Sequence, residues 1–172
     1  MNYGNIDFMS IVDGEGCRVS LFVSGCRNHC PGCFNPKTWD FNFGKEFTPI
    51  EENEIIEACK QPYIDGLTVV GGEPFEEENQ AGLLRFLARF KTECPNKTLW
   101  MYTGYVLEKD LLKGQRKHVE VVTDRILDLV DTLVDGPFIQ AQRDLSLRFR
   151  GSSNQRLLSR AEITELRNKK TA

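Results

Sequence analysis

Three cysteines lie within eight residues of one another, at Cys26, Cys30 and Cys33. The segment follows an apolar run and contains proline and glycine, which favours a loop. Thiolates are the usual ligands of iron–sulfur clusters, and a loop with the spacing C-x3-C-x2-C can wrap them around one inorganic centre. Three protein ligands leave one iron of a four-iron cluster open to a small molecule, as the vacant position does in a catalytic zinc site. The pattern therefore favours an iron–sulfur cluster at which chemistry can occur.

A zinc site is the alternative interpretation of the same cysteines, with His29 or Cys17 as the fourth ligand. Zinc sites normally show a second paired set of ligands, and the sequence has no such pair. His118 lies in a charged stretch, where we expect it to be solvated. We expect Cys59 and Cys94 to be ordinary residues of helix faces or helix ends, because free cysteine behaves as a small hydrophobe.

A glycine pair closes the second apolar run of the chain, in Gly71-Gly72-Glu73-Pro74. Glycine tolerates positive φ and lets the backbone approach a ligand closely. Backbone carbonyls at this turn could therefore receive the ammonium group of a ligand. The alternative is a plain turn at the end of a strand.

Apolar runs alternate with amphipathic segments along the chain, which is typical of βα units around a mainly parallel sheet. Thr48 and Ser159 each precede a glutamate by three residues, so we expect both to open helices with a capping box. The predicted strands are 19–24, 66–70, 98–102, 132–134, 145–149 and 154–158. The predicted helices are 48–60, 77–94, 107–112, 119–129 and 159–170. In parallel α/β proteins ligands lie beyond the carboxyl ends of the strands, so we expect the glycine-containing turns to gather there.

Composition limits the class of protein. The chain has 172 residues, of which 40% are hydrophobic and 27% charged, so we expect one domain with a core at about 13–158 and a polar C-terminal helix at about 159–170. A formal net charge of -3 gives no basic footprint for nucleic acid. No secretory leader and no apolar run of membrane-spanning length is visible, which predicts a cytoplasmic protein that binds no membrane.

The cysteine motif and the Gly-Gly-Glu turn, on successive βα units, resemble the radical S-adenosylmethionine superfamily. Many members carry an aromatic residue before the third cysteine, where this chain has Gly32, and Phe34 is expected to supply the ring instead. Within the superfamily, the chain is most similar to the family that activates anaerobic ribonucleoside-triphosphate reductase. The similar segments are 13–16, 21–26, 30–35, 71–74, 102–105, 133–138 and 150–155.

The resemblance implies a partial (βα) barrel, a mainly parallel α/β sheet with the site at the carboxyl ends of its strands. It also implies that the three clustered cysteines ligate a [4Fe–4S] cluster whose unique iron binds S-adenosylmethionine. The residues expected near this cofactor are Gly32, Cys33, Phe34, Gly72, Glu73 and Thr103. For Thr103 the alternative is again an ordinary turn, and no side chain is expected to act as a catalytic acid or base.

The implied reaction makes a glycyl radical on the large subunit of the reductase, with an electron donor such as flavodoxin. Three other functions stay open at this point. The chain could activate another glycyl-radical enzyme, such as pyruvate formate-lyase, or be a small modified-base synthase that uses the same cofactor. A zinc-binding module without catalysis is the alternative from a different class.

Overall fold

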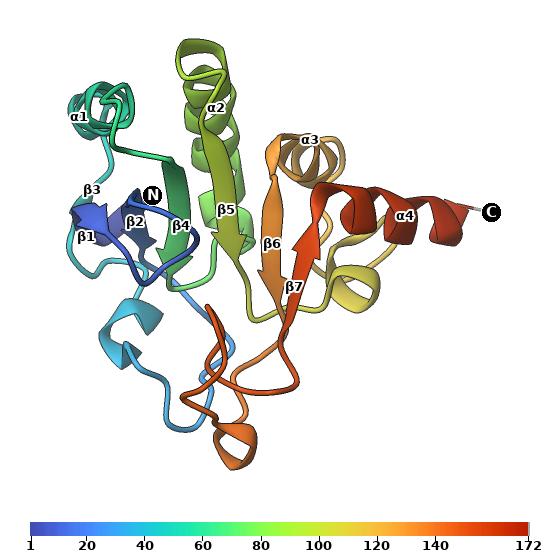
Figure 1. Ribbon diagram of the computed structural model, residues 1–172. Coiled ribbons are helices and arrows are strands. Elements are labelled where there is room, and N and C mark those ends of the chain that lie inside the picture. Colours follow the sequence, from blue (N-terminus) through green and yellow to red (C-terminus); the bar gives the residue numbers. More distant parts are fainter. Residues whose placement is uncertain (172) are drawn as a thin grey trace.

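The computed structural model describes residues 1–171, with the side chains of residues 1–169, and is built on a seven-stranded sheet (Figure 1). The order across the sheet is β3-β1-β2-β4-β5-β6-β7. The strands are β1 (Asn2–Ser10), β2 (Arg18–Val23), β3 (Lys45–Glu46), β4 (Gly66–Gly71), β5 (Thr98–Tyr102), β6 (Thr132–Asp135) and β7 (Arg156–Ser159). The helices are α1 (Pro49–Cys59), α2 (Glu77–Glu93), α3 (Val122–Leu129) and α4 (Arg160–Thr171), with shorter helical turns at Pro36–Trp39, Leu107–Leu111 and Gln140–Gln142.

The centre of the sheet is parallel, in the row β2, β4, β5 and β6. Strands β1, β3 and β7 each pair antiparallel with a neighbour. This confirms the predicted α/β class with a mainly parallel sheet. The partial barrel is not confirmed, because the sheet is open and ends at β3 and β7. Antiparallel strands occupy both edges, so no further parallel βα unit extends the row toward closure.

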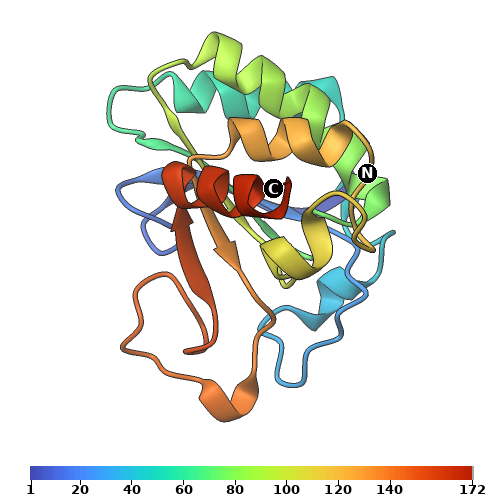
Figure 2. The same cartoon turned by 90° about the vertical axis from the view of Figure 1, so that its right-hand side faces the viewer.

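Helices α1, α2 and α3 lie together on one side of the sheet, and α4 lies beside β7 (Figure 2). Strand residues such as Val19 and Leu21 point into this layer and form one buried core with Leu83, Phe86 and Phe90 of α2. Burial of each such side chain contributes about 1.5–3 kcal/mol. No helix within residues 1–171 is both long and apolar enough to cross a membrane.

Arg18 lies at the start of β2, at the end of the sheet opposite the Gly71-Gly72 turn, and its side chain is buried. Its guanidinium donates to the hydroxyl oxygens of Thr68 and Thr98 at 2.8 and 2.9 Å, and to the carbonyl oxygens of Glu15, Leu67 and Thr98. All of these acceptors are neutral, and burial lowers the pKa of Arg18 to about 10. Arg18 therefore ties together the starts of three parallel strands.

Most predicted elements are confirmed within one or two residues, including the capping boxes at Thr48 and Ser159. The strand predicted at 145–149 is wrong. This segment forms no strand, the nearest pairing is an isolated bridge from Arg143 to Ser152, and Phe149 has φ of 57°. Helix α3 begins three residues later than predicted, because Val121 has φ of 67°. Strands β1 and β3 were not predicted.

Two long loops leave the carboxyl ends of the parallel strands and lie together at that end of the sheet (Figure 1). The first, residues 24–44, follows β2 and contains the three clustered cysteines. The second, residues 136–155, follows β6. The glycine turn after β4 and the turn after β5 lie at this same end of the sheet. The fold therefore gathers these four segments, as the sequence predicts.

Candidate functional site

The cysteine loop begins directly after β2 and is fixed at its start by backbone hydrogen bonds. The amide of Gly25 donates to the carbonyl of Thr38 at 2.8 Å, and the amide of Cys26 donates to the carbonyl of Trp39 at 3.2 Å. Cys26 is buried, whereas Cys30 and Cys33 are half-buried and share a turn in which the Cys33 amide donates to the Cys30 carbonyl at 3.0 Å. The structure therefore places the first cysteine inside the fold and the other two nearer the surface.

The three thiols suit a cluster by their chemistry. None forms a disulfide, and three cysteines on one loop are the usual donors for an iron–sulfur cluster. Among residues 1–171, however, no three cysteine, histidine or carboxylate side chains are gathered closely enough to hold a metal ion. The loop thus provides the donors without a finished cage, and binding has to draw the sulfurs together.

Burial affects the protonation of two of these thiols, those of Cys26 and Cys30. It raises the pKa of Cys26 to about 12, against a hydrogen bond from the Asn28 amide that acts in the opposite direction. Burial also raises the pKa of Cys30, whose sulfur accepts from the Phe138 amide. A cysteine that binds a metal must be a thiolate. Binding of a cluster by this loop is therefore expected to release protons from both cysteines.

The alternative zinc ligands lie differently. Cys17 precedes β2 while Cys26 follows it, and a strand of this length spans about 20 Å. The structure therefore does not bring Cys17 to the clustered cysteines. The ring of His29 packs on Trp39, with 4.6 Å between ring centroids. The prediction that His118 is solvated is wrong, because its side chain is 7% exposed and its Nε2 lies 2.9 Å from a carboxylate oxygen of Asp124.

The glycine pair at the end of β4 is required by the packing of the backbone. Gly71 has φ of +107°, and a Cβ there would lie 2.7 Å from backbone atoms of Val23. A Cβ on Gly72 would lie 2.6 Å from the carbonyl oxygen of Gly25 and 2.9 Å from that of Thr38. The Gly72 amide also donates to the Val23 carbonyl at 2.7 Å. The turn is therefore pressed against the start of the cysteine loop.

Glu73 is fully buried and joins the three segments around it. One carboxylate oxygen accepts from the Phe75 amide at 3.0 Å and the Thr103 hydroxyl at 2.7 Å. The other accepts from the Gly104 amide at 2.7 Å and the Asn28 side-chain amide at 3.1 Å. All four donors are neutral, and burial outweighs them and raises the pKa of Glu73 to about 7.

The remaining predicted site residues lie around this centre in different environments. Thr103 is buried, and its hydroxyl accepts from the Tyr105 amide at 3.0 Å while donating to Glu73. Gly32 has φ of +74° and faces the side chain of Gln140, a residue of the loop after β6. Phe34 is fully exposed. The structure thus joins Thr103 to Glu73 and leaves Phe34 on the surface.

The loop after β6 is fastened to itself and to the turn after β5. The Gly136 amide donates to the Tyr105 carbonyl at 2.9 Å, and the side-chain amide of Gln155 donates to the Gly136 carbonyl at 3.0 Å. Arg150 donates to the backbone carbonyl of Gln155 at 3.0 Å. Asp135 is buried and accepts two hydrogen bonds from Arg156. Through Phe138 and Gln140 this loop reaches the cysteine loop.

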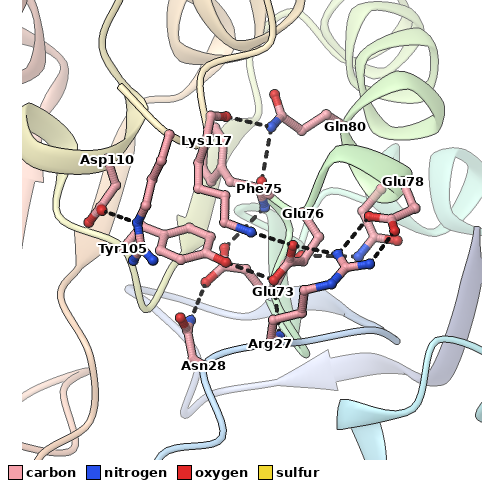
Figure 3. A network of polar contacts seen from close by, with 12 residues as sticks. Arg27, Asn28, Glu73, Phe75, Glu76, Glu78, Gln80, Tyr105, Asp110 and Lys117 are labelled. Carbon is pink, nitrogen blue, oxygen red and sulfur yellow. Dashed lines mark hydrogen bonds and ion pairs between the residues drawn. The ribbon is translucent and has the colours of Figure 1, made fainter. Parts of the chain in front are cut away.

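Four residues at the site were missed by the sequence analysis, namely Arg27, Glu76, Tyr105 and Lys117. Figure 3 shows Arg27 and Lys117 approaching the carboxylate of Glu76 from two sides, with the Tyr105 hydroxyl between them and Glu73 nearby. Two features of the sequence could have indicated them. Arg27 directly follows a cluster cysteine, and Glu76 follows Glu73 by three residues.

Comparison with known proteins gives a consistent result. A family model described as a 4Fe-4S single cluster domain matches residues 12–158. A protein of Haemophilus influenzae is 44% identical over 157 residues, which cover 90% of this chain and 96% of that protein. Relatives from Escherichia coli strain K12, at 40% identity over the same shares, and from enterobacteria phage T4, at 34% identity over 94% of this chain and 96% of the relative, also match. All three are named anaerobic ribonucleoside-triphosphate reductase-activating protein.

Proposed function

The chain belongs to the family of anaerobic ribonucleoside-triphosphate reductase-activating proteins and carries a 4Fe-4S single cluster domain, and from this premise we propose that it activates the reductase by reductive cleavage of S-adenosylmethionine. The observation that carries the proposal is the position of three free thiols on one loop beyond the parallel strands, against the Gly71–Glu73 turn. Ligand sites of open α/β sheets lie at this edge.

We assign the cluster to Cys26, Cys30 and Cys33, and contacts with S-adenosylmethionine to Gly32, Cys33, Phe34 and Gly72. The burial of Glu73 and Thr103 favours a supporting part for these two residues. Their side chains bind each other and the neighbouring backbone, so they are proposed to hold the walls of the cofactor site in place.

A cluster held by Cys26, Cys30 and Cys33 would supply the electron for reductive cleavage of S-adenosylmethionine to methionine and a 5′-deoxyadenosyl group, which would take a hydrogen atom from a glycine of the reductase large subunit. A reductant such as flavodoxin provides the electron. The chain itself positions the donors and gives up the thiol protons. No side chain of this chain is assigned as an acid or base in the cleavage.

The proposal is tested by anaerobic reconstitution with iron and sulfide, followed by incubation with S-adenosylmethionine and dithionite. We expect 5′-deoxyadenosine and methionine to form in equal amounts, as measured by liquid chromatography. Addition of the reductase large subunit is expected to give the doublet of a glycyl radical in electron paramagnetic resonance. Pyruvate formate-lyase serves as the control partner and is expected to give none.

Matched cysteine variants make this assay specific. Cys30→Ala is expected to abolish 5′-deoxyadenosine formation. Cys94→Ala removes a thiol buried at the end of α2 and is expected to leave formation of the product intact. One stoichiometric zinc without sulfide in the wild-type protein, or full activity of Cys30→Ala, would overturn the proposal.

A further inference from the structure

Glu76 lies immediately before α2, three residues after Glu73, and its carboxylate is completely buried. One oxygen accepts from the Arg27 amide at 3.0 Å and the Tyr105 hydroxyl at 2.7 Å. The other accepts from the Arg27 guanidinium at 2.8 Å and the Lys117 ammonium at 2.7 Å (Figure 3). A single carboxylate therefore joins the cysteine loop, the turn after β5 and the segment before α3.

The two buried carboxylates of this turn differ in their electrostatic surroundings. Glu73 has neutral donors alone, whereas Glu76 is bound by two cations. Burial by itself would raise the pKa of Glu76, but the hydrogen bonds from Lys117, Tyr105 and Arg27 together outweigh it, and the pKa lies below its ordinary value. Glu76 is thus a permanent negative charge inside the fold.

Both carboxylates hold the chain directly after Cys26. Arg27 binds Glu76 through its backbone and its side chain, and the next residue, Asn28, binds Glu73. The path of the loop as it leaves the first cysteine is consequently set by the turn after β4. A salt bridge needed for stability alone would not have to involve the backbone of the residue adjacent to a ligand cysteine.

We propose that Glu76 is a positioning residue for the cluster, which fixes Cys26 against the Gly71–Glu73 turn and keeps the charges of Arg27 and Lys117 beside the site. This inference rests on the proposed function, because it assumes that Cys26 is a ligand. Cluster potentials depend on nearby net charge and hydrogen bonding. Since reduction adds a negative charge to the cluster, the Glu76 carboxylate disfavours the reduced state while the two cations favour it.

The test measures the midpoint potential of the reconstituted holoprotein by anaerobic redox titration. Glu76→Gln removes one negative charge, so we expect the potential to rise and the spectrum of the reduced cluster to change. Glu78→Gln is the matched control, because this substitution removes the same charge from a residue that also binds Arg27. The side chain of Glu78, however, is 49% exposed. Solvent screens an exposed charge, so the control is expected to shift the potential much less.

Loss of iron to a chelator gives a second measurement of positioning. Mutation of residues that hold metal ligands in place typically lowers metal affinity about 10- to 100-fold. We therefore expect Glu76→Gln to lose iron at least about 10-fold faster than Glu78→Gln. Tyr105→Phe removes one hydrogen bond to Glu76 without changing charge. It is expected to speed iron loss while leaving the potential near that of the wild type.

Lys117→Met keeps the inference testable if Glu76→Gln fails to fold. It removes a cation that donates to Glu76, so we expect the potential to fall. Equal potentials and equal rates of iron loss in Glu76→Gln and Glu78→Gln, or an unchanged potential in Lys117→Met, would overturn the inference and leave the proposed function standing. A wild-type chain that binds no iron and sulfide would overturn both.

Discussion

Replacement of Glu73 by glutamine should remove a specific pH dependence of stability. The pKa of Glu73 is raised from 4.5 to about 7 in the folded chain. Between these two values the folded state holds a proton that the unfolded state has released, so stability falls as pH rises. A difference of 2.5 pKa units corresponds to about 3 kcal/mol. Stability from this group is therefore fully present below pH 4.5 and lost above about pH 7.

The glutamine side chain is neutral at every pH and lacks this titration. It also turns an NH2 group toward two of the four donors that now face the carboxylate, at a cost of about 1–3 kcal/mol for an unsatisfied buried donor. We expect Glu73→Gln to be less stable than the wild type at pH 5. Between pH 5 and pH 8 the difference in the free energy of unfolding between wild type and variant should shrink by about 2.5 kcal/mol, or reverse sign.

The assay is urea unfolding of the metal-free, reduced chain, followed by circular dichroism at pH 5 and pH 8. The difference between wild type and variant removes the contribution of other groups that titrate equally in both. Glu77→Gln, at the exposed first position of α2, is the control for the loss of one carboxylate. A gap for Glu73→Gln that changes by less than 1 kcal/mol would refute the reasoning.

Three further predictions concern stability measured by the same unfolding assay. Gly72→Ala should destabilise by about 1–3 kcal/mol, because its Cβ would meet two backbone carbonyls below 3.0 Å, whereas Gly82→Ala, which meets only the side chain of Met1 at 3.5 Å, should stabilise by about 0.5–1 kcal/mol. Equal effects would contradict the packing argument. Thr48→Ala should cost about 1 kcal/mol through loss of the capping box of α1, and no loss would show that the cap is dispensable. Arg18→Met should cost about 3 kcal/mol or more, since it leaves buried acceptors unpaired; a cost below 1 kcal/mol would contradict the assigned role.

The repeating elements of the fold could be predicted from the sequence because their signals are local. Strands such as Thr98–Tyr102 are short apolar runs between turns. The start of the helix after Thr48 is indicated by its capping box. Strand β1 gave no such signal, because several of its residues, including Phe8 and Met9, are exposed where β1 continues past the two-residue strand β3. The alternation in residues 145–149 resembles that of a strand, but the segment is a loop, in which Leu145 is exposed and the ring of Phe149 packs on Trp100.

The candidate site could be predicted only in part for a similar reason. Cysteine spacing identifies Cys26, Cys30 and Cys33, and the glycine turn is visible as Gly71-Gly72. Glu76 looks like an ordinary acidic residue at a helix start, a position that the helix dipole favours. The residues that bind and bury it lie 29 to 49 residues away in the chain. The spacing of three residues from Glu73 points to Glu76 as a candidate, but no local feature of the sequence reveals its contacts.

The central claim is that the three clustered thiols share one iron–sulfur cluster, and iron and acid-labile sulfide analysis after anaerobic reconstitution tests it most directly. We predict about four irons and four sulfides for each wild-type or Cys94→Ala chain. Cys26→Ala, Cys30→Ala and Cys33→Ala should each retain far less. Full iron and sulfide in any of these three variants, or zinc without sulfide in the wild type, would contradict the claim.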